Sequence, residues 1–248
     1  MKTKVKVLVL ATILILVLTE FVNAQPEVPF FEGIIGNTPE DYVFSLRLLI
    51  VLTILTLAPS ILIMMTSFTR IIIVLSFIRN ALGMQQTPPN QVIIGLALFL
   101  TFFIMTPVAQ EINANAIQPY TNEEINFSEA LDRAMEPIRK FMFKQTRNKD
   151  LALFLNISNL EEINGIEDVP NNVLIPAFII SELKTAFQIG FVIYIPFLII
   201  DMVVSSTLMS MGMMMLPPVI ISLPFKILLF VLVDGWNLIT KSLILGFN

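Results

Sequence analysis

The sequence has no cysteine and no histidine, and only 14% of its 248 residues are charged. Without cysteine there is no disulfide framework and no thiolate chemistry, and without histidine the commonest general base and metal ligand are missing. A formal charge of -4 with no basic cluster also argues against a nucleic-acid partner. We therefore expect neither an enzyme nor a metal or cofactor site.

Apolar residues are abundant instead. They make up 56% of the chain, and the mean hydropathy is +0.83. A soluble domain needs a more polar surface than this composition allows. The composition predicts a protein that lies in or beside a membrane.

The N-terminus has the pattern of a secretory signal peptide. Three lysines precede an apolar run over residues 7–18, and the small-residue pattern Val22-Asn23-Ala24 follows. We expect cleavage between Ala24 and Gln25, because the run is short for the alternative, a membrane span that stays. Residues 25–41 then form an irregular periplasmic lead-in rich in proline and glycine.

Four hydrophobic elements follow in two pairs, over residues 42–83, 90–110, 173–206 and 219–247. We predict an all-α, multi-pass membrane protein with a first hairpin over 42–110 and a second over 172–248. The first element, about forty residues, would reach roughly 60 Å, twice a hydrocarbon core, so we expect it to bend near Pro59 or to leave the bilayer.

A polar segment over 111–171 separates the two hairpins, and we expect it to be periplasmic and helical. Its first amphipathic helix is predicted to begin at an N-cap, Ser128, and to be interrupted or kinked at Pro137. A second amphipathic stretch carries a capping-box pattern at Ser158 and Glu161. These helices either pack on the rest of the chain or form a subunit interface outside the membrane.

Charged residues inside the apolar elements are costly, at about 2.5 to 3.5 kcal/mol for each unpaired charge at the membrane centre. They must be paired, line a wet path or avoid lipid. The prolines also interrupt these helices, which a membrane tolerates only where protein or water covers the freed backbone groups. The charged residues are Arg47, Arg70, Glu182, Lys184, Asp201, Lys226 and Asp234.

Counting from the turn of the second hairpin predicts which charges pair. Asp201 and Lys226 are nearly equidistant from the turn, so they should meet at one depth. Glu182 would face Lys241 more loosely, and Lys184 is left for acceptors of a neighbouring subunit. The Asp201–Lys226 pair either stabilises packing or relays protons or ions, and mutual neutralisation favours packing.

The turn itself reads "LMSMGMMMLPP" over residues 208–218. Gly212, Pro217 and Pro218 are predicted to shape a hinge around the flexible thioether side chains. By its residues alone, this stretch is a soft hairpin turn, a flexible core or a lipid contact. Its methionines are Met209, Met211, Met213, Met214 and Met215.

Long blocks of the sequence resemble the FliP/SctR family of type III secretion export-gate subunits. They include "KQTRNKDLALF", "GMMMLPP" and "LPFKILLFVLVDGW", together with residues 59–107 and 181–206, in the family's order and spacing. The resemblance covers nearly everything from about Tyr42 onward. The signal peptide favours the flagellar branch, with the equivalent subunit of a virulence-type injectisome as the alternative.

The resemblance implies a core pore-forming subunit of the flagellar export gate, through which unfolded flagellar subunits cross the inner membrane within the basal body. It implies about five copies assembled with FliQ and FliR in a helical, ring-like pore complex, joined by FlhA and FlhB. It also implies that Met213, Met214 and Met215 form a gasket across the pore, with Met209 and Met211 as weaker candidates. No nucleotide-binding loop is present, so energy would come from other subunits.

Two other functions fit the residues less well. An intramembrane hydrolase would need a nucleophile and a base, for which Ser181 and Lys184 are the nearest pair. A secondary transporter would explain broken helices and buried carboxylates, but the chain shows no internal repeat and no polar substrate cluster.

Overall fold

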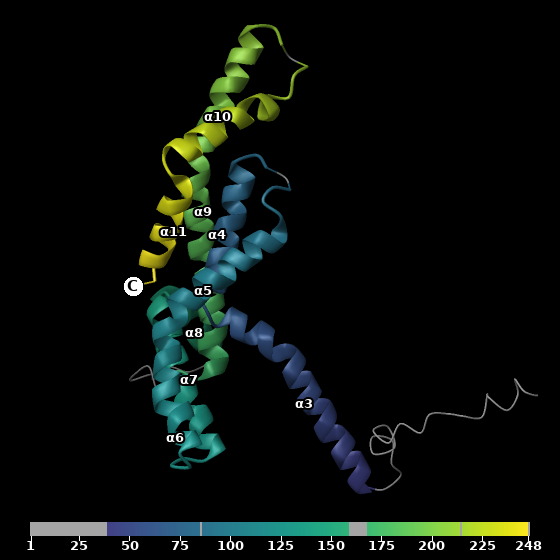
Figure 1. Cartoon of the computed structure of the whole chain (residues 1–248), viewed down its shortest axis with the longest axis vertical. Helices are drawn as coiled ribbons and strands as arrows, with labels where there is room; N and C mark the ends of the chain where they lie inside the picture. The colour runs from purple at the N-terminus through teal and green to yellow at the C-terminus, as the bar shows by residue number, and fades with distance from the viewer. Residues whose placement is uncertain (1–38, 85, 159–167, 214, 248) are drawn as a thin grey trace, which may run out of the picture. The chain divides into compact units, whose positions relative to one another are not determined.

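A computed structural model describes residues 39–84, 86–158, 168–213 and 215–247 (Figure 1). This part of the chain consists of helices, and no strand occurs in it. The expected cleavage site at Ala24 and Gln25 and the lead-in up to residue 38 lie outside the described residues. The chain divides into two compact units, residues 1–58 and 59–248.

Helix α3 (Pro39–Met64) begins in the first unit, and most of its described apolar side chains are exposed. The helix does not break at Pro59, because it continues through this residue and ends at Met64. A proline removes only one donor from the helical ladder, and neighbouring turns can retain the helix. The break comes at residues 65–67, where the Thr66 hydroxyl donates to Ile63 O at 2.8 Å and competes with the helical ladder.

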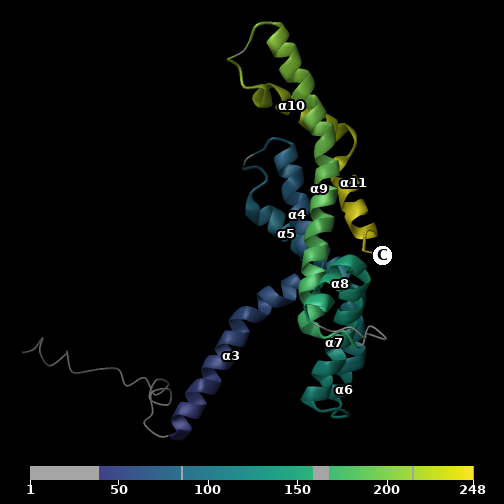
Figure 2. The ribbon, with the colours of Figure 1, turned by 180° about the vertical axis from the view of Figure 1, so that it is seen from behind.

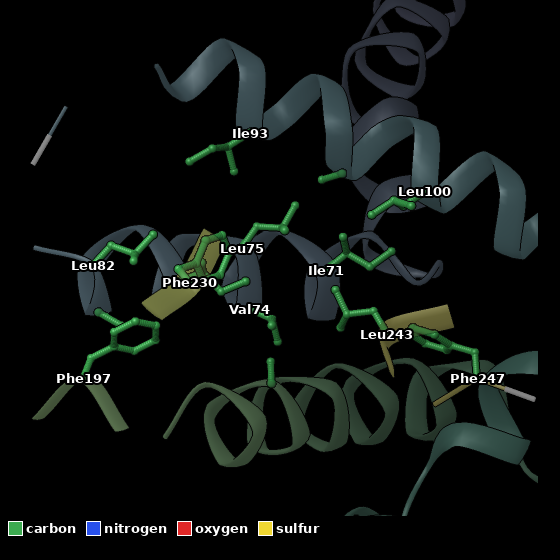
Figure 3. Packing of buried hydrophobic residues seen from close by; sticks show 14 residues of the cluster. Ile71, Val74, Leu75, Leu82, Ile93, Leu100, Phe197, Phe230, Leu243 and Phe247 are labelled. Atoms are coloured by element: carbon green, nitrogen blue, oxygen red, sulfur yellow. The ribbon is translucent and has the colours of Figure 1, made fainter. Parts of the chain in front are cut away.

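Helix α4 (Phe68–Ala81) forms the centre of the second unit. Ile71, Val74, Leu75 and Ile78 recur at three and four residues and are almost fully buried. They pack between α5 (Asn90–Ile112) and α9 (Asn171–Ser210), as Figure 3 shows. The second half of the first hydrophobic element is therefore a short, buried helix.

Helix α9, at 40 residues, is the longest described element and contacts α4, α7, α8 and α10. Both ribbon views show it running along these helices (Figures 1 and 2). It packs tightly on α4 at Gly190, where an added Cβ would lie 2.5 Å from Phe77 Cγ. Glycine is therefore needed where these two helices meet.

The described part of the polar segment is helical, as the sequence predicts. Helix α5 leads through a π-helical turn, η2 (Asn113–Ile117), into α6 (Gln118–Thr121), and α7 (Phe127–Gln145) and α8 (Asn148–Ile157) follow. Helices α7 and α8 pack on α9, with Met142 and Phe178 buried between them.

The structure differs in part from what the sequence predicts for these helices. Asn126, not Ser128, caps α7, because its Oδ1 accepts a hydrogen bond from Glu129 N at 2.9 Å. Pro137 lies inside α7, which continues past it. Ser158 is the C-cap of α8, and Glu161, the other member of the capping-box pattern, lies outside the described residues.

The second hairpin consists of α9, α10 (Pro218–Leu232) and α11 (Gly235–Leu245), with a bend of 62° between the last two. The bend lies at Asp234, which adopts a left-handed conformation with φ 49°. Within the described ranges, three helical stretches are long and apolar enough to cross a membrane: 42–61, 90–121 and 171–210. A fourth exists if the bent pair counts as one span.

Candidate functional site: a methionine loop and two buried ion pairs

The loop between α9 and α10 contains the methionine-rich stretch, and we name residues 209–217 the methionine loop. Helix α9 ends in a Schellman motif, in which Met213 N donates to Leu208 O and Gly212 N donates to Met209 O, both at 3.0 Å. Gly212 supplies the left-handed residue of this motif, with φ +76°. Pro217 and Pro218 then begin α10. The glycine and the prolines thus define both ends of the loop, as predicted.

The methionine side chains of this loop are exposed. Met215 is 98% exposed, Met211 71%, Met209 64% and Met213 45%. Met142 and Met65, which lie in the core, are 0% and 3% exposed. The loop therefore presents its described thioethers outward, in contrast to Met142 and Met65 in the core. Met214 lies outside the described residues.

Below the loop, an ion pair joins the two arms of the hairpin. Lys226 Nζ on α10 lies 2.6 Å from Asp201 Oδ2 on α9, so the contact predicted by counting is present. Lys226 also donates to Ala81 O, the last residue of α4, at 3.2 Å, and Ser222 Oγ donates to Asp201 Oδ1 at 2.5 Å. Lys226 is 2% exposed and Asp201 26%. The pair ties α9 and α10 to the end of α4.

A second ion pair lies further along α9. The guanidinium of Arg70 on α4 binds both carboxylate oxygens of Glu182, with Nε 2.9 Å from Oε2 and a close contact between Nη2 and Oε1. The exposed fractions are 4% for Arg70 and 0% for Glu182. Bidentate geometry of this kind is the strong form of an arginine–carboxylate contact.

The partner expected for Glu182 is therefore wrong. Lys241 is exposed on α11, and the cation that neutralises Glu182 is Arg70. Both are charges in apolar runs of the sequence, but their pairing is not predictable from it, because 112 positions separate them. Lys184 is exposed on α9, away from the buried carboxylate two residues earlier.

Further polar contacts that the sequence analysis missed hold the α7–α8 junction on α9. Arg147 N donates to Ser181 Oγ at 2.9 Å, and the Arg147 guanidinium contacts Thr185 and Gln188. Ser181 is thus occupied as an acceptor and is fully buried, beside a lysine that is exposed. This arrangement does not resemble a serine–lysine nucleophile. The spacing Ser181, Thr185 and Gln188 on one helix face was the available signal.

Long apolar helices, a loop of exposed thioethers and internally neutralised charges define an all-α membrane protein rather than a soluble domain. The FliP family model matches residues 51–243 of this chain. The flagellar biosynthetic protein FliP of Bacillus subtilis (strain 168) is 62% identical over 212 residues, which are 86% of this chain and 96% of that protein.

FliP proteins of other bacteria are similar as well. FliP of Aquifex aeolicus (strain VF5) is 54% identical over 84% of this chain and 88% of its own length. FliP of Borreliella burgdorferi is 51% identical over 88% of this chain and 85% of its own length. The chain belongs to the FliP family, and its role lies in the flagellar export apparatus. The flagellar assignment is favoured over the injectisome one.

Proposed function

We propose that this chain is a pore-forming subunit of the flagellar protein export gate, and that methionine loops from several copies close the pore. The observation that carries the proposal is the outward exposure of Met209, Met211, Met213 and Met215 at the tip of one hairpin. Met214 belongs to the same loop by sequence. Thioether side chains adapt to irregular shapes, and a narrow apolar constriction excludes water and ions by dewetting. A ring of these side chains, one loop from each copy, seals the empty pore and changes shape around an unfolded chain in transit.

The apolar outer faces of α9 and α10 support assembly with other subunits. Phe191 on α9 is 68% exposed and Leu232 on α10 73%. Beside the loop, the two arms leave an apolar groove of about 490 Å³, lined in part by Val203 and Phe225. In the proposal, further copies, about five in all, together with FliQ and FliR, cover these faces. Lys184 then meets acceptors of a neighbouring subunit.

The proposed place of the complex is the bacterial inner membrane, within the flagellar basal body, with FlhA and FlhB as further partners. Unfolded flagellar proteins are the cargo. The proposed role is that of a conduit and not of a catalyst, so the energy for export comes from other subunits. We also propose that residues 1–24 are removed, which N-terminal sequencing of the mature chain tests.

The gasket is tested by replacing Met213, Met214 and Met215 together with alanine in the assembled complex. The expected result is a leak of ions or small solutes through the gate, because alanine leaves the constriction wider. Met202→Ala is the matched control, since Met202 is 60% exposed on α9 but lies outside the loop. Conductance of the membrane and export of flagellar subunits are measured in the same cells. A tight gate in the triple variant would contradict the proposal.

A further inference from the structure

The buried guanidinium of Arg70 needs more acceptors than Glu182 supplies. Arginine has five N–H donors, and the bidentate contact with Glu182 uses two of them. The side chain is only 4% exposed, so water has little access to the remaining donors. A buried donor without an acceptor is destabilising.

The acceptors come from two distant parts of the chain. Arg70 Nη1 donates to the main-chain oxygen of Gly246 at 3.0 Å, and Nη2 donates to Gln145 Oε1 at 3.0 Å. Gln145 Nε2 in turn donates to the main-chain oxygen of Phe247 at 3.1 Å. Gly246 is 176 positions from Arg70. The end of the chain therefore supplies two main-chain carbonyls to this network.

The ring of Phe247 holds these carbonyls in place. Its centroid lies 3.8 Å from Arg70 Cζ, a cation–π contact, and the residue is 5% exposed. The same ring stacks on Phe141 of α7, with 6.1 Å between centroids. Figure 3 shows Phe247 beside Leu243 at one end of the core cluster. Through Phe141 and Gln145, the end of the chain contacts the last two turns of α7.

We propose that Gly246 and Phe247 form a C-terminal latch that holds the polar-segment helices in their place on α9. Before the latch docks, Arg70 Nη1 lacks its acceptor, the main-chain oxygen of Gly246, and Gln145 Nε2 lacks its acceptor, the main-chain oxygen of Phe247. Helix α7 then opens locally from α9. The α7–α8 segment becomes stable only when the last residues of the second hairpin have been made and docked.

Other contacts in the same region limit how much of the chain opens when the latch undocks. The hydrogen bond from Arg147 N to Ser181 Oγ and the packing of α4 on α9 do not involve the latch residues and remain when the latch undocks. Undocking the latch therefore opens α7 without unfolding the chain. The α4–α9 contact around Ile78, beside the other ion pair, stays closed.

A cysteine-free chain allows a clean test, because an introduced cysteine is the only thiol. Met142→Cys reports whether α7 is packed on α9, and Ile78→Cys reports whether the α4–α9 core is closed, since both positions are 0% exposed. Each reporter is combined with Phe247→Ala or Gln145→Met, which undo the latch from opposite sides. Leu245→Ala is the matched control, at a 57% exposed position of α11. The full chain, co-expressed with its partners in native membranes, is labelled with membrane-permeant N-ethylmaleimide.

The expected result is labelling at position 142 that is about tenfold faster in both latch variants, the scale of one lost hydrogen bond to a buried charge. Labelling at position 78 stays slow, and the control changes neither rate. Unchanged labelling at position 142 in both variants would overturn the latch. Equal acceleration at both positions would overturn it too, by showing a loss of global stability. Acceleration by the Phe247 variant alone would overturn the coupling through Gln145.

Discussion

The two members of the Asp201–Lys226 pair are buried to different extents, so removing one should destabilise the chain more than removing the other. Lys226 is 2% exposed, whereas Asp201 is 26% exposed and also accepts from Ser222. Asp201→Asn leaves a buried ammonium without a counter-charge, with only neutral oxygens such as Ala81 O as acceptors. Removing one partner of a buried pair costs about 3 to 5 kcal/mol, so we expect a loss of free energy of unfolding in this range.

The converse change should be milder. Lys226→Met leaves a carboxylate that keeps its bond to Ser222 and some contact with solvent, so we expect a loss of about 1 to 3 kcal/mol. The double variant replaces both charges by neutral side chains of similar size. Its loss should be smaller than that of Asp201→Asn alone, because no charge remains buried without a partner.

The assay is unfolding of the purified full chain in mild detergent by titration with a denaturing detergent. Lys184→Met is the matched control, because it removes an exposed lysine from the same hairpin and should change stability by less than about 0.5 kcal/mol. Losses that simply add in the double variant would refute a stabilising ion pair. The proton-relay alternative instead predicts near-normal stability in both single variants together with lost export.

Two further predictions concern packing and surface charge. Gly190→Ala should destabilise the chain by about 1 to 3 kcal/mol, because its Cβ would lie 2.5 Å from Phe77 Cγ. Gly95→Ala, with nothing within 4 Å, should be neutral or stabilising by about 0.5 to 1 kcal/mol in the same unfolding assay, and equal losses would refute the clash. The hydrogen bond and charge of Lys140 lower the pKa of Glu136 in α7, so Lys140→Gln should raise that pKa in an NMR titration. The stabilisation from this carboxylate is present above its unfolded pKa and is lost as the pH falls through the lowered folded pKa; an unchanged Glu136 titration would refute the contact.

Contacts close to a turn were predictable, whereas contacts between distant helices were not. Asp201 and Lys226 flank one hairpin loop, so equal spacing from the turn places them together. Arg70 and Glu182 meet only because α4 packs on α9, and no periodicity in either helix indicates which cation serves which carboxylate. The identity of Glu182's partner depends on tertiary packing.

Helix ends show the same division between local and tertiary causes. Gly212 and the prolines after it were identified correctly, because a left-handed residue and a missing N–H are local requirements. Asn126 and Ser128 both have cap-forming side chains, and the extended backbone of Asn126 decides between them. At Pro59 the helix continues, so proline alone is a weak signal for a break in an apolar helix.

The positions of the two carboxylates on α9 relate the fold to bilayer thickness. Glu182 and Asp201 are 19 residues apart (201 - 182), about 28 Å along a helix that rises 1.5 Å per residue. A hydrocarbon core is about 30 Å thick, so in any bilayer that α9 crosses upright, at most one of the two ion pairs can lie at the midplane. When one lies at one surface, the other lies near the opposite surface. The stretch between them then acts as a hydrophobic ruler, and a thicker or thinner bilayer costs a fraction of a kcal/mol per Å of mismatch.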